Sequence, residues 1–186
     1  MVIFETHATS LDNEAGLASG WYDVDLSPTG EQQARELGER RRLTGIDAVF
    51  CSDLTRARRT AEIAFGTRGI PLHAEPRLRE CHYGDLTRAP AADVEVRRLD
   101  CIDNPFPGGE SYTQAVARVQ QWLSEKVTSS PSRTVVVIGH RATFYAFEHL
   151  LRRIPLRDVI AAPWHWQPGW TYAVTAGGPV GRVGGV

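Results

Sequence analysis

The run TVVVI at residues 134–138 is an unbroken stretch of β-branched residues, and it constrains the possible folds more than any other segment. Two shorter runs, VIF at 2–4 and IDAVF at 46–50, have a similar character. Such nearly uninterrupted strands are typical of a parallel sheet that is buried on both faces. These runs therefore predict three strands of a parallel sheet, and WTYAV at 170–174 predicts a fourth strand.

Helical patterns fill the sequence between these runs. Ser27 followed by Pro28 is typical of a helix start. Ser111 and Gln114 form a capping box before a periodic apolar face, and we interpret ERRR at 39–42 as a solvated helix end. The expected helices cover residues 29–42, 52–65, 111–126 and 141–153. Alternating strands and helices predict an α/β three-layer sandwich, in which helices cover both faces of a mostly parallel central sheet.

The length of the chain, 186 residues, fits one domain. A domain of this length buries roughly 70% of the surface that its unfolded chain exposes. We therefore expect a single domain over residues 1–186, with its glycine-rich end, from about residue 176, as a flexible tail. The segment 71–107 carries prolines and charges with little periodicity, which predicts a long excursion over the sheet.

Charge and cysteine content limit the possible partners and compartment. The formal net charge of −1 gives no long-range attraction to nucleic acid or to an anionic membrane, so we expect neither as a partner. The start MVIFE lacks a basic leader, and no segment reaches the length of a membrane span. Cys51, Cys81 and Cys101 form no Cys-x-x-Cys pair and cannot all pair within one chain. We expect a cytoplasmic protein, whose oligomeric state the sequence leaves open.

Chemistry-bearing residues follow the first three strands. His7 follows the first strand, Arg56 lies in SDLTR after the second, and His140 lies in GHR after the third. If these strands are parallel neighbours, the three side chains converge at the carboxyl edge of the sheet, where open α/β sheets bind ligands. Two histidines, an arginine and helix N-termini favour an anion, most naturally phosphate. The alternative is that these are structural histidines.

Six motifs lie along the chain in a fixed order: THATS at 6–10 with Asn13, GWYDVDLSPTGEQQA at 20–34, CSDLTRARRTAE at 51–62, LRECHYGDL at 78–86, PGGESY at 107–112 and VVVIGHRAT at 135–143. Together they resemble the motifs of the histidine phosphatase superfamily, in its phosphoglycerate-mutase-like branch. The resemblance covers most of the chain and implies a phosphoglycerate-mutase-like fold.

The resemblance also implies a two-step phosphoryl transfer. His7 would attack phosphorus and hold the group as a phosphohistidine, while its other ring nitrogen donates to a backbone carbonyl. Arg56 would grip the phosphate oxygens, His140 would stabilise their charge, and Asn13 would add an amide donor. Glu80 would protonate the leaving alkoxide and then activate water, a role that works best with a raised pKa. No metal or cofactor is implied.

The chain departs from the family at Thr6, where the family pattern has an arginine that shares the phosphate. Threonine offers one hydroxyl and no charge. Arg141, directly after His140, could replace the missing cation. Alternatively, the pocket accepts a substrate with less charge or a different shape, or catalysis has been lost and the fold serves as a binding module.

The short segment between Glu80 and GGES at 108–111 resembles the small phosphatases of the family more than its mutases. We therefore expect a metal-independent phosphatase acting on a small phosphorylated metabolite, with a catalytically silent binding module and a mutase as alternatives. Asp85 and His82 compete with Glu80 for the role of the acid. Trp164 and Trp166, in PWHWQPGW at 163–170, either form an aromatic wall for the substrate or pack over the last strand.

Overall fold

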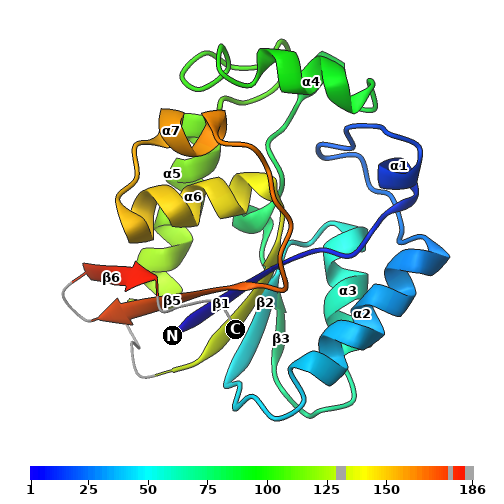
Figure 1. Cartoon of the computed structure of the whole chain (residues 1–186), viewed down its shortest axis with the longest axis vertical. Helices are drawn as coiled ribbons and strands as arrows, with labels where there is room; N and C mark the ends of the chain where they lie inside the picture. The colour runs from blue at the N-terminus through cyan, green and yellow to red at the C-terminus, as the bar shows by residue number, and fades with distance from the viewer. Residues whose placement is uncertain (129–132, 176–177, 183–186) are drawn as a thin grey trace.

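The computed structural model describes residues 1–128, 133–175 and 178–182, which form a central sheet between two layers of helices (Figure 1). The sheet has six strands in the order β3-β2-β4-β1-β5-β6. Neighbouring strands from β3 to β1 are parallel, whereas β5 is antiparallel to β1. The strands are β1 (Val2–Thr6), β2 (Ala48–Cys51), β3 (Leu72–Ala74), β4 (Val135–Gly139), β5 (Trp170–Thr175) and β6 (Gly178–Arg182). The predicted α/β class and mostly parallel sheet are confirmed.

Helices cover both faces of the sheet, with α2 and α3 on one side and α5 and α6 on the other (Figure 1). The short helices α1 and α4 lie beyond the carboxyl ends of the parallel strands. The α-helices are α1 (Leu11–Glu14), α2 (Pro28–Arg40), α3 (Thr55–Phe65), α4 (Ala91–Arg97), α5 (Tyr112–Lys126), α6 (Arg141–Arg152) and α7 (Leu156–Ala161), and the 3-10 helices are η1 (Pro76–Leu78) and η2 (Gly84–Leu86).

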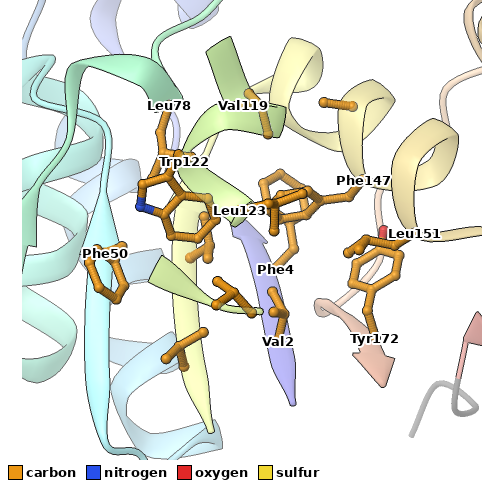
Figure 2. Close-up of a cluster of buried hydrophobic side chains, with 14 of the residues drawn as sticks. Val2, Phe4, Phe50, Leu78, Val119, Trp122, Leu123, Phe147, Leu151 and Tyr172 are labelled. Carbon is orange, nitrogen blue, oxygen red and sulfur yellow. The ribbon is translucent and has the colours of Figure 1, made fainter. Parts of the chain in front are cut away.

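Alternation along β1 explains why its first three residues, Val2, Ile3 and Phe4, are all apolar. Phe4 joins the cluster between the sheet and α5 and α6, where its ring meets that of Phe147 edge-on at 5.6 Å (Figure 2). The preceding residue, Ile3, belongs instead to the cluster on the α3 side, with Phe65. Because successive strand residues point to opposite faces, a strand buried on both faces needs an apolar residue at every position.

The predicted helix starts are confirmed. The Ser27 hydroxyl accepts the backbone N–H of Gly30 at 3.1 Å, and Pro28 opens α2. The Ser111 hydroxyl accepts the Gln114 N–H at 3.2 Å, and the Gln114 amide oxygen accepts the Ser111 N–H at 2.8 Å. Each cap satisfies N–H groups that the first turn of a helix leaves unpaired.

Three sequence-based expectations need correction. The excursion over 71–107 contains the edge strand β3, two 3-10 helices and α4, elements too short to show a periodic pattern. Part of the expected tail, Gly178–Arg182, is strand β6 beside β5, while residues 176–177 and 183–186 lie outside the described part of the chain. At the expected solvated end of α2, Glu39 and Arg42 are exposed as expected, whereas Arg40 and Arg41 pair with the buried carboxylate of Glu5, at 3.1 and 2.7 Å.

Within the described residues, no helix is both long and apolar enough to cross a membrane. Cys51, Cys81 and Cys101 are free and buried. Burial is the main cause that raises the pKa of the Cys81 thiol, so this neighbour of Glu80 stays protonated and unreactive at neutral pH.

Candidate active site

His7 and His140 meet because β1 and β4 are neighbouring parallel strands. Thr6 pairs with Gly139 at the carboxyl end of the two strands, and the His7 N–H donates to the Gly139 carbonyl at 2.9 Å. The next residue on each strand is therefore a histidine, and the two ring centroids lie 4.9 Å apart. Strand β2 lies on the other side of β4 and leads into α3, which carries Arg56. The side chains of His7, Arg56 and His140 therefore converge at this edge of the sheet, as expected.

The hydrogen bonding of His7 fixes its tautomer. Its Nδ1 lies 2.7 Å from the carbonyl oxygen of Ala8, which can only accept, so Nδ1 carries the proton. Burial, followed by the nearby charge of Arg56, lowers the pKa of His7 from 6.5 to about 3. The ring is therefore neutral at pH 7, and its Nε2 carries a lone pair, as a nucleophile requires.

Arg56 is the buried cation of the site. Its side chain is almost fully enclosed, with the whole residue only 2% exposed. The two terminal nitrogens donate to the backbone carbonyls of Tyr22 at 3.1 Å and Gly20 at 2.8 Å, so the loop after α1 holds the guanidinium in place. Burial lowers the pKa of Arg56, although an arginine stays protonated at any physiological pH.

His140 is set up as a hydrogen-bond donor. Its Nδ1 lies 3.4 Å from a guanidinium nitrogen of Arg56, which can only donate, so the ring proton of a neutral His140 is on Nε2. Burial, followed by the charges of Arg56 and His7, lowers the pKa of His140 well below its ordinary value. Among the described residues its buried Nε2 has no hydrogen-bond partner. An oxyanion is the partner that such a donor lacks.

The carboxylate of Glu80 lies at the N-terminus of α6. One oxygen accepts the N–H groups of Cys81 at 2.8 Å and Ala142 at 3.0 Å, and the other accepts the N–H of Arg141 at 3.2 Å. These three backbone donors, two of them at the N-terminus of α6, hold the carboxylate in place. Its backbone carbonyl accepts further bonds from the side chains of Trp21 at 2.6 Å and Arg118 at 2.9 Å.

Asn13 and Thr6 border the two histidines. The side-chain oxygen of Asn13 accepts both the N–H and the hydroxyl of Ser10, at 3.0 Å each, which leaves the amide nitrogen to donate elsewhere. Thr6, the last residue of β1, is half-buried and presents a small side chain beside His7.

A cavity of about 250 Å³ brings the predicted residues together. It is lined by all nine predicted site residues: His7, Glu80, His140, Arg56, Asn13, Thr6, Arg141, Trp164 and Trp166. The rivals for the acid role, His82 and Asp85, are not among its lining residues. The cavity therefore presents a neutral nucleophile, one buried cation, a neutral donor and a carboxylate to a single ligand.

Arg141 is not a free cation. Its guanidinium forms a salt bridge with Glu95, a residue of α4 that also lines the cavity. The Arg141 head lies 5.6 Å from the ring of Trp164, which in turn packs edge-on against Phe144 at 5.1 Å. Trp164 thus lines the cavity and also packs against the core. Trp166 also lines the cavity, but it is 62% exposed.

Sequence reasoning missed several residues of the site. Tyr83 lines the cavity, and burial raises the pKa of its hydroxyl, which stays a neutral donor. Its position in the LRECHYGDL motif was a signal that could have identified it. Glu95 carried no such signal, because α4 lies in the segment interpreted as an irregular excursion. Arg118 binds the carbonyl of Glu80 and the carboxylate of Glu110, and the GGES motif supplies that carboxylate.

Among the described residues, no group of three or more histidine, cysteine or acidic side chains is arranged to hold a metal ion.

Known proteins resemble this chain over nearly its whole length. The profile of the histidine phosphatase superfamily (branch 1) matches residues 2–169. An adenosylcobalamin/alpha-ribazole phosphatase of Salmonella typhimurium is 30% identical over 172 residues, which cover 87% of this chain and 82% of that protein. A 2,3-bisphosphoglycerate-dependent phosphoglycerate mutase of Methylobacterium is 34% identical over 155 residues, 75% and 74% of the two chains. The solved structure of Bacillus stearothermophilus YhfR has the same fold, with a TM-score of 0.83 and 24% identity over 96% of this chain and 92% of its own.

Proposed function

The chain belongs to the histidine phosphatase superfamily, whose members are phosphatases or mutases, and we propose that it is a phosphatase that hydrolyses a small phosphorylated metabolite without a metal. The observation that carries this proposal is the neutral His7, whose free Nε2 shares one cavity with Arg56, His140 and Glu80. In the free protein, Nε2 of His7 carries a lone pair for attack on phosphorus, and Nε2–H of His140 is a hydrogen-bond donor.

In the first step, the Nε2 lone pair of His7 attacks phosphorus and the bond from phosphorus to the leaving oxygen breaks. Arg56 and the Nε2–H of His140 donate to the phosphoryl oxygens as their charge develops. A protonated Glu80 gives its proton to the leaving oxygen.

In the second step, the Glu80 carboxylate takes a proton from water, which attacks the phosphohistidine. The bond from phosphorus to Nε2 breaks, and inorganic phosphate and the free histidine result. Dividing one displacement into two in this way lowers the barrier of each. The hydrogen bond from Nδ1 to Ala8 holds the ring in the same orientation throughout.

The charge of the cavity supports a phosphatase more than a mutase. Arg56 is its buried cation, while Arg141 is paired with Glu95. A mutase has to hold two phosphate groups and exclude water, and this set of charges suits one phosphate group better than two. The cytoplasm, as the compartment of a protein with three buried free thiols, is part of the same proposal.

Hydrolysis of 4-nitrophenyl phosphate in EDTA, followed by rapid quenching, tests the proposal. We expect turnover by the natural protein and a phosphate label that survives alkali and is released by acid, as a phosphohistidine is. His7→Asn should abolish both turnover and label. Glu80→Gln should still label, because 4-nitrophenolate leaves without a proton, and should release its phosphate at least about tenfold more slowly. Absence of turnover and of label across several phosphomonoesters would favour the silent binding module instead.

A further inference from the structure

Next to the active-site cavity lies a second cavity of about 390 Å³, between the end of β1 and helix α2. The two cavities share four lining residues: Thr6, His7, Asn13 and Trp166. They therefore adjoin each other at the nucleophile itself. The small side chain of Thr6 borders this junction, where a long side chain would separate the two spaces.

About half of the lining of the second cavity is polar. Gln33, Glu36 and Arg40 line it from α2, and Thr9 lines it from the loop after His7. The Gln33 amide oxygen accepts the N–H and the hydroxyl of Thr9, at 3.0 and 2.9 Å, which leaves its amide nitrogen to donate. Such a lining suits a small group that bears hydroxyls, since these can both donate and accept hydrogen bonds.

The charges around His7 match a singly charged phosphate. His7 and His140 are neutral, and the guanidinium of Arg141 is paired with Glu95. Arg40 is paired with the buried Glu5. Of these groups, Arg56 alone is a cation that forms no ion pair with a carboxylate within the part of the chain that the structure describes. A phosphomonoester carries close to two negative charges at pH 7, whereas a phosphodiester carries one.

We infer that the site has a second activity, the hydrolysis of a phosphodiester, in which the substituent that stays on phosphorus occupies the cavity beyond Thr6. This inference rests on the covalent role of His7 in the proposed function. An in-line attack places the leaving group opposite Nε2, on the Glu80 side, so the retained substituent extends sideways past Thr6. The retained group is small and hydroxyl-bearing.

The reaction balances with water as its single co-reactant. His7 Nε2 bonds to phosphorus, the bond to the leaving oxygen breaks, and Glu80 supplies the proton that makes this product an alcohol. The intermediate is a phosphohistidine that still carries the retained substituent. Water then gives its proton to Glu80 and attacks phosphorus, the P–N bond breaks, and a phosphomonoester is released.

Two variants close the second cavity from different sides. Thr6→Arg places a long side chain at the junction, and Glu36→Trp fills the cavity from an exposed position of α2. Activity is compared on 3-hydroxypropyl 4-nitrophenyl phosphate, a diester whose retained group bears a hydroxyl, and on 4-nitrophenyl phosphate, a monoester. We expect both variants to lower kcat/KM for the diester by about tenfold or more. Glu36→Trp, whose position lies outside the active-site cavity, should leave kcat/KM for the monoester unchanged. Thr67→Arg, at an exposed turn, is the matched control for added charge.

The possible failures are distinguishable. Turnover of the monoester with none of the diester would overturn this inference and leave the proposed function intact. Equal losses on both substrates in the two variants would also overturn it, because the second cavity would then have no selective role. If neither substrate is turned over and His7 is not labelled, the proposed function fails and the inference fails with it.

Discussion

At the scale of single residues, two histidines in one cavity have opposite hydrogen-bonding roles. Ala8 accepts from His7 at Nδ1, so Nε2 of His7 is a base, whereas Arg56 donates to Nδ1 of His140, so Nε2 of His140 is a donor. Two residues of the same type, His7 and His140, thus serve as nucleophile and oxyanion donor. Their different neighbours decide which is which.

The lowered pKa of His7 predicts a pH dependence of stability. The pKa is about 3 in the folded protein against 6.5 for an ordinary histidine, so between these values the unfolded chain binds more protons. The free energy of unfolding therefore falls as the pH drops through this window. Between pH 7 and pH 5, we expect the free energy of unfolding of His7→Asn to fall by less than that of the natural protein, and the difference to be on the order of 1 kcal/mol.

Urea unfolding of the natural protein and of His7→Asn at both pH values measures this difference. His165→Asn replaces an exposed histidine and serves as the matched control. A natural protein whose stability falls by the same amount as that of His7→Asn would contradict the neutral state of the half-buried His7.

At the scale of elements, the N-terminus of α6 organises the site. Its first N–H groups hold the Glu80 carboxylate, and its first side chain, Arg141, forms the salt bridge to Glu95 on α4. Helix α4 lies beyond the carboxyl ends of the parallel strands in Figure 1, so this ion pair connects α4 to the N-terminus of α6 at the active site. Arg98 also contacts Glu95, at 2.8 Å, so the three side chains together carry one positive charge.

Opposite effects on phosphate binding are expected from the two halves of this ion pair. Arg141→Ala removes one positive charge from the cavity, while Glu95 keeps its contact with Arg98 at 2.8 Å, and should weaken inhibition by inorganic phosphate by roughly 10- to 100-fold. Glu95→Gln releases the Arg141 cation and should strengthen it. The inhibition constant of phosphate at low ionic strength measures both effects. Arg58→Ala and Glu39→Gln, at exposed positions, are controls that should change it little. Equal small effects in all four variants would remove Arg141 as a phosphate ligand.

At the scale of the whole molecule, the connection from α7 to β5 crosses to the cavity before the chain returns to the sheet. Trp164 packs against Phe144 and Trp170 in the core and also lines the active-site cavity. Trp166 lines both cavities from an exposed position. One indole is therefore part of the folded core, and the other contributes mainly to the site.

These two tryptophans should separate binding from stability. Trp166→Ala removes cavity wall without core packing, so we expect a changed KM and a melting temperature within about 2 °C of the natural protein. Trp164→Ala also removes buried aromatic contacts and should lower the melting temperature by several degrees. Steady-state kinetics with two phosphomonoesters and thermal unfolding measure these effects. A large loss of melting temperature in Trp166→Ala would show that this indole is structural.

The sequence by itself determined the elements with long, regular patterns and the residues at their ends. Unbroken apolar strands, the caps at Ser27 and Ser111, and the six ordered motifs predicted the α/β class and a set of residues that all line one cavity. These features are readable because burial on both faces and helix capping impose local residue requirements.

Tertiary structure alone decided which charges are free. Two sets of ion pairs join residues that are far apart in the chain: Arg40 and Arg41 with Glu5, and Arg141 with Glu95. The second cavity beyond Thr6 likewise lies between segments that are distant in the sequence. No local pattern encodes these contacts, because each depends on how α2 and α4 pack around the sheet edge. Whether an arginine binds a ligand or a neighbouring carboxylate is set by this packing, and the charge that the site presents follows from it.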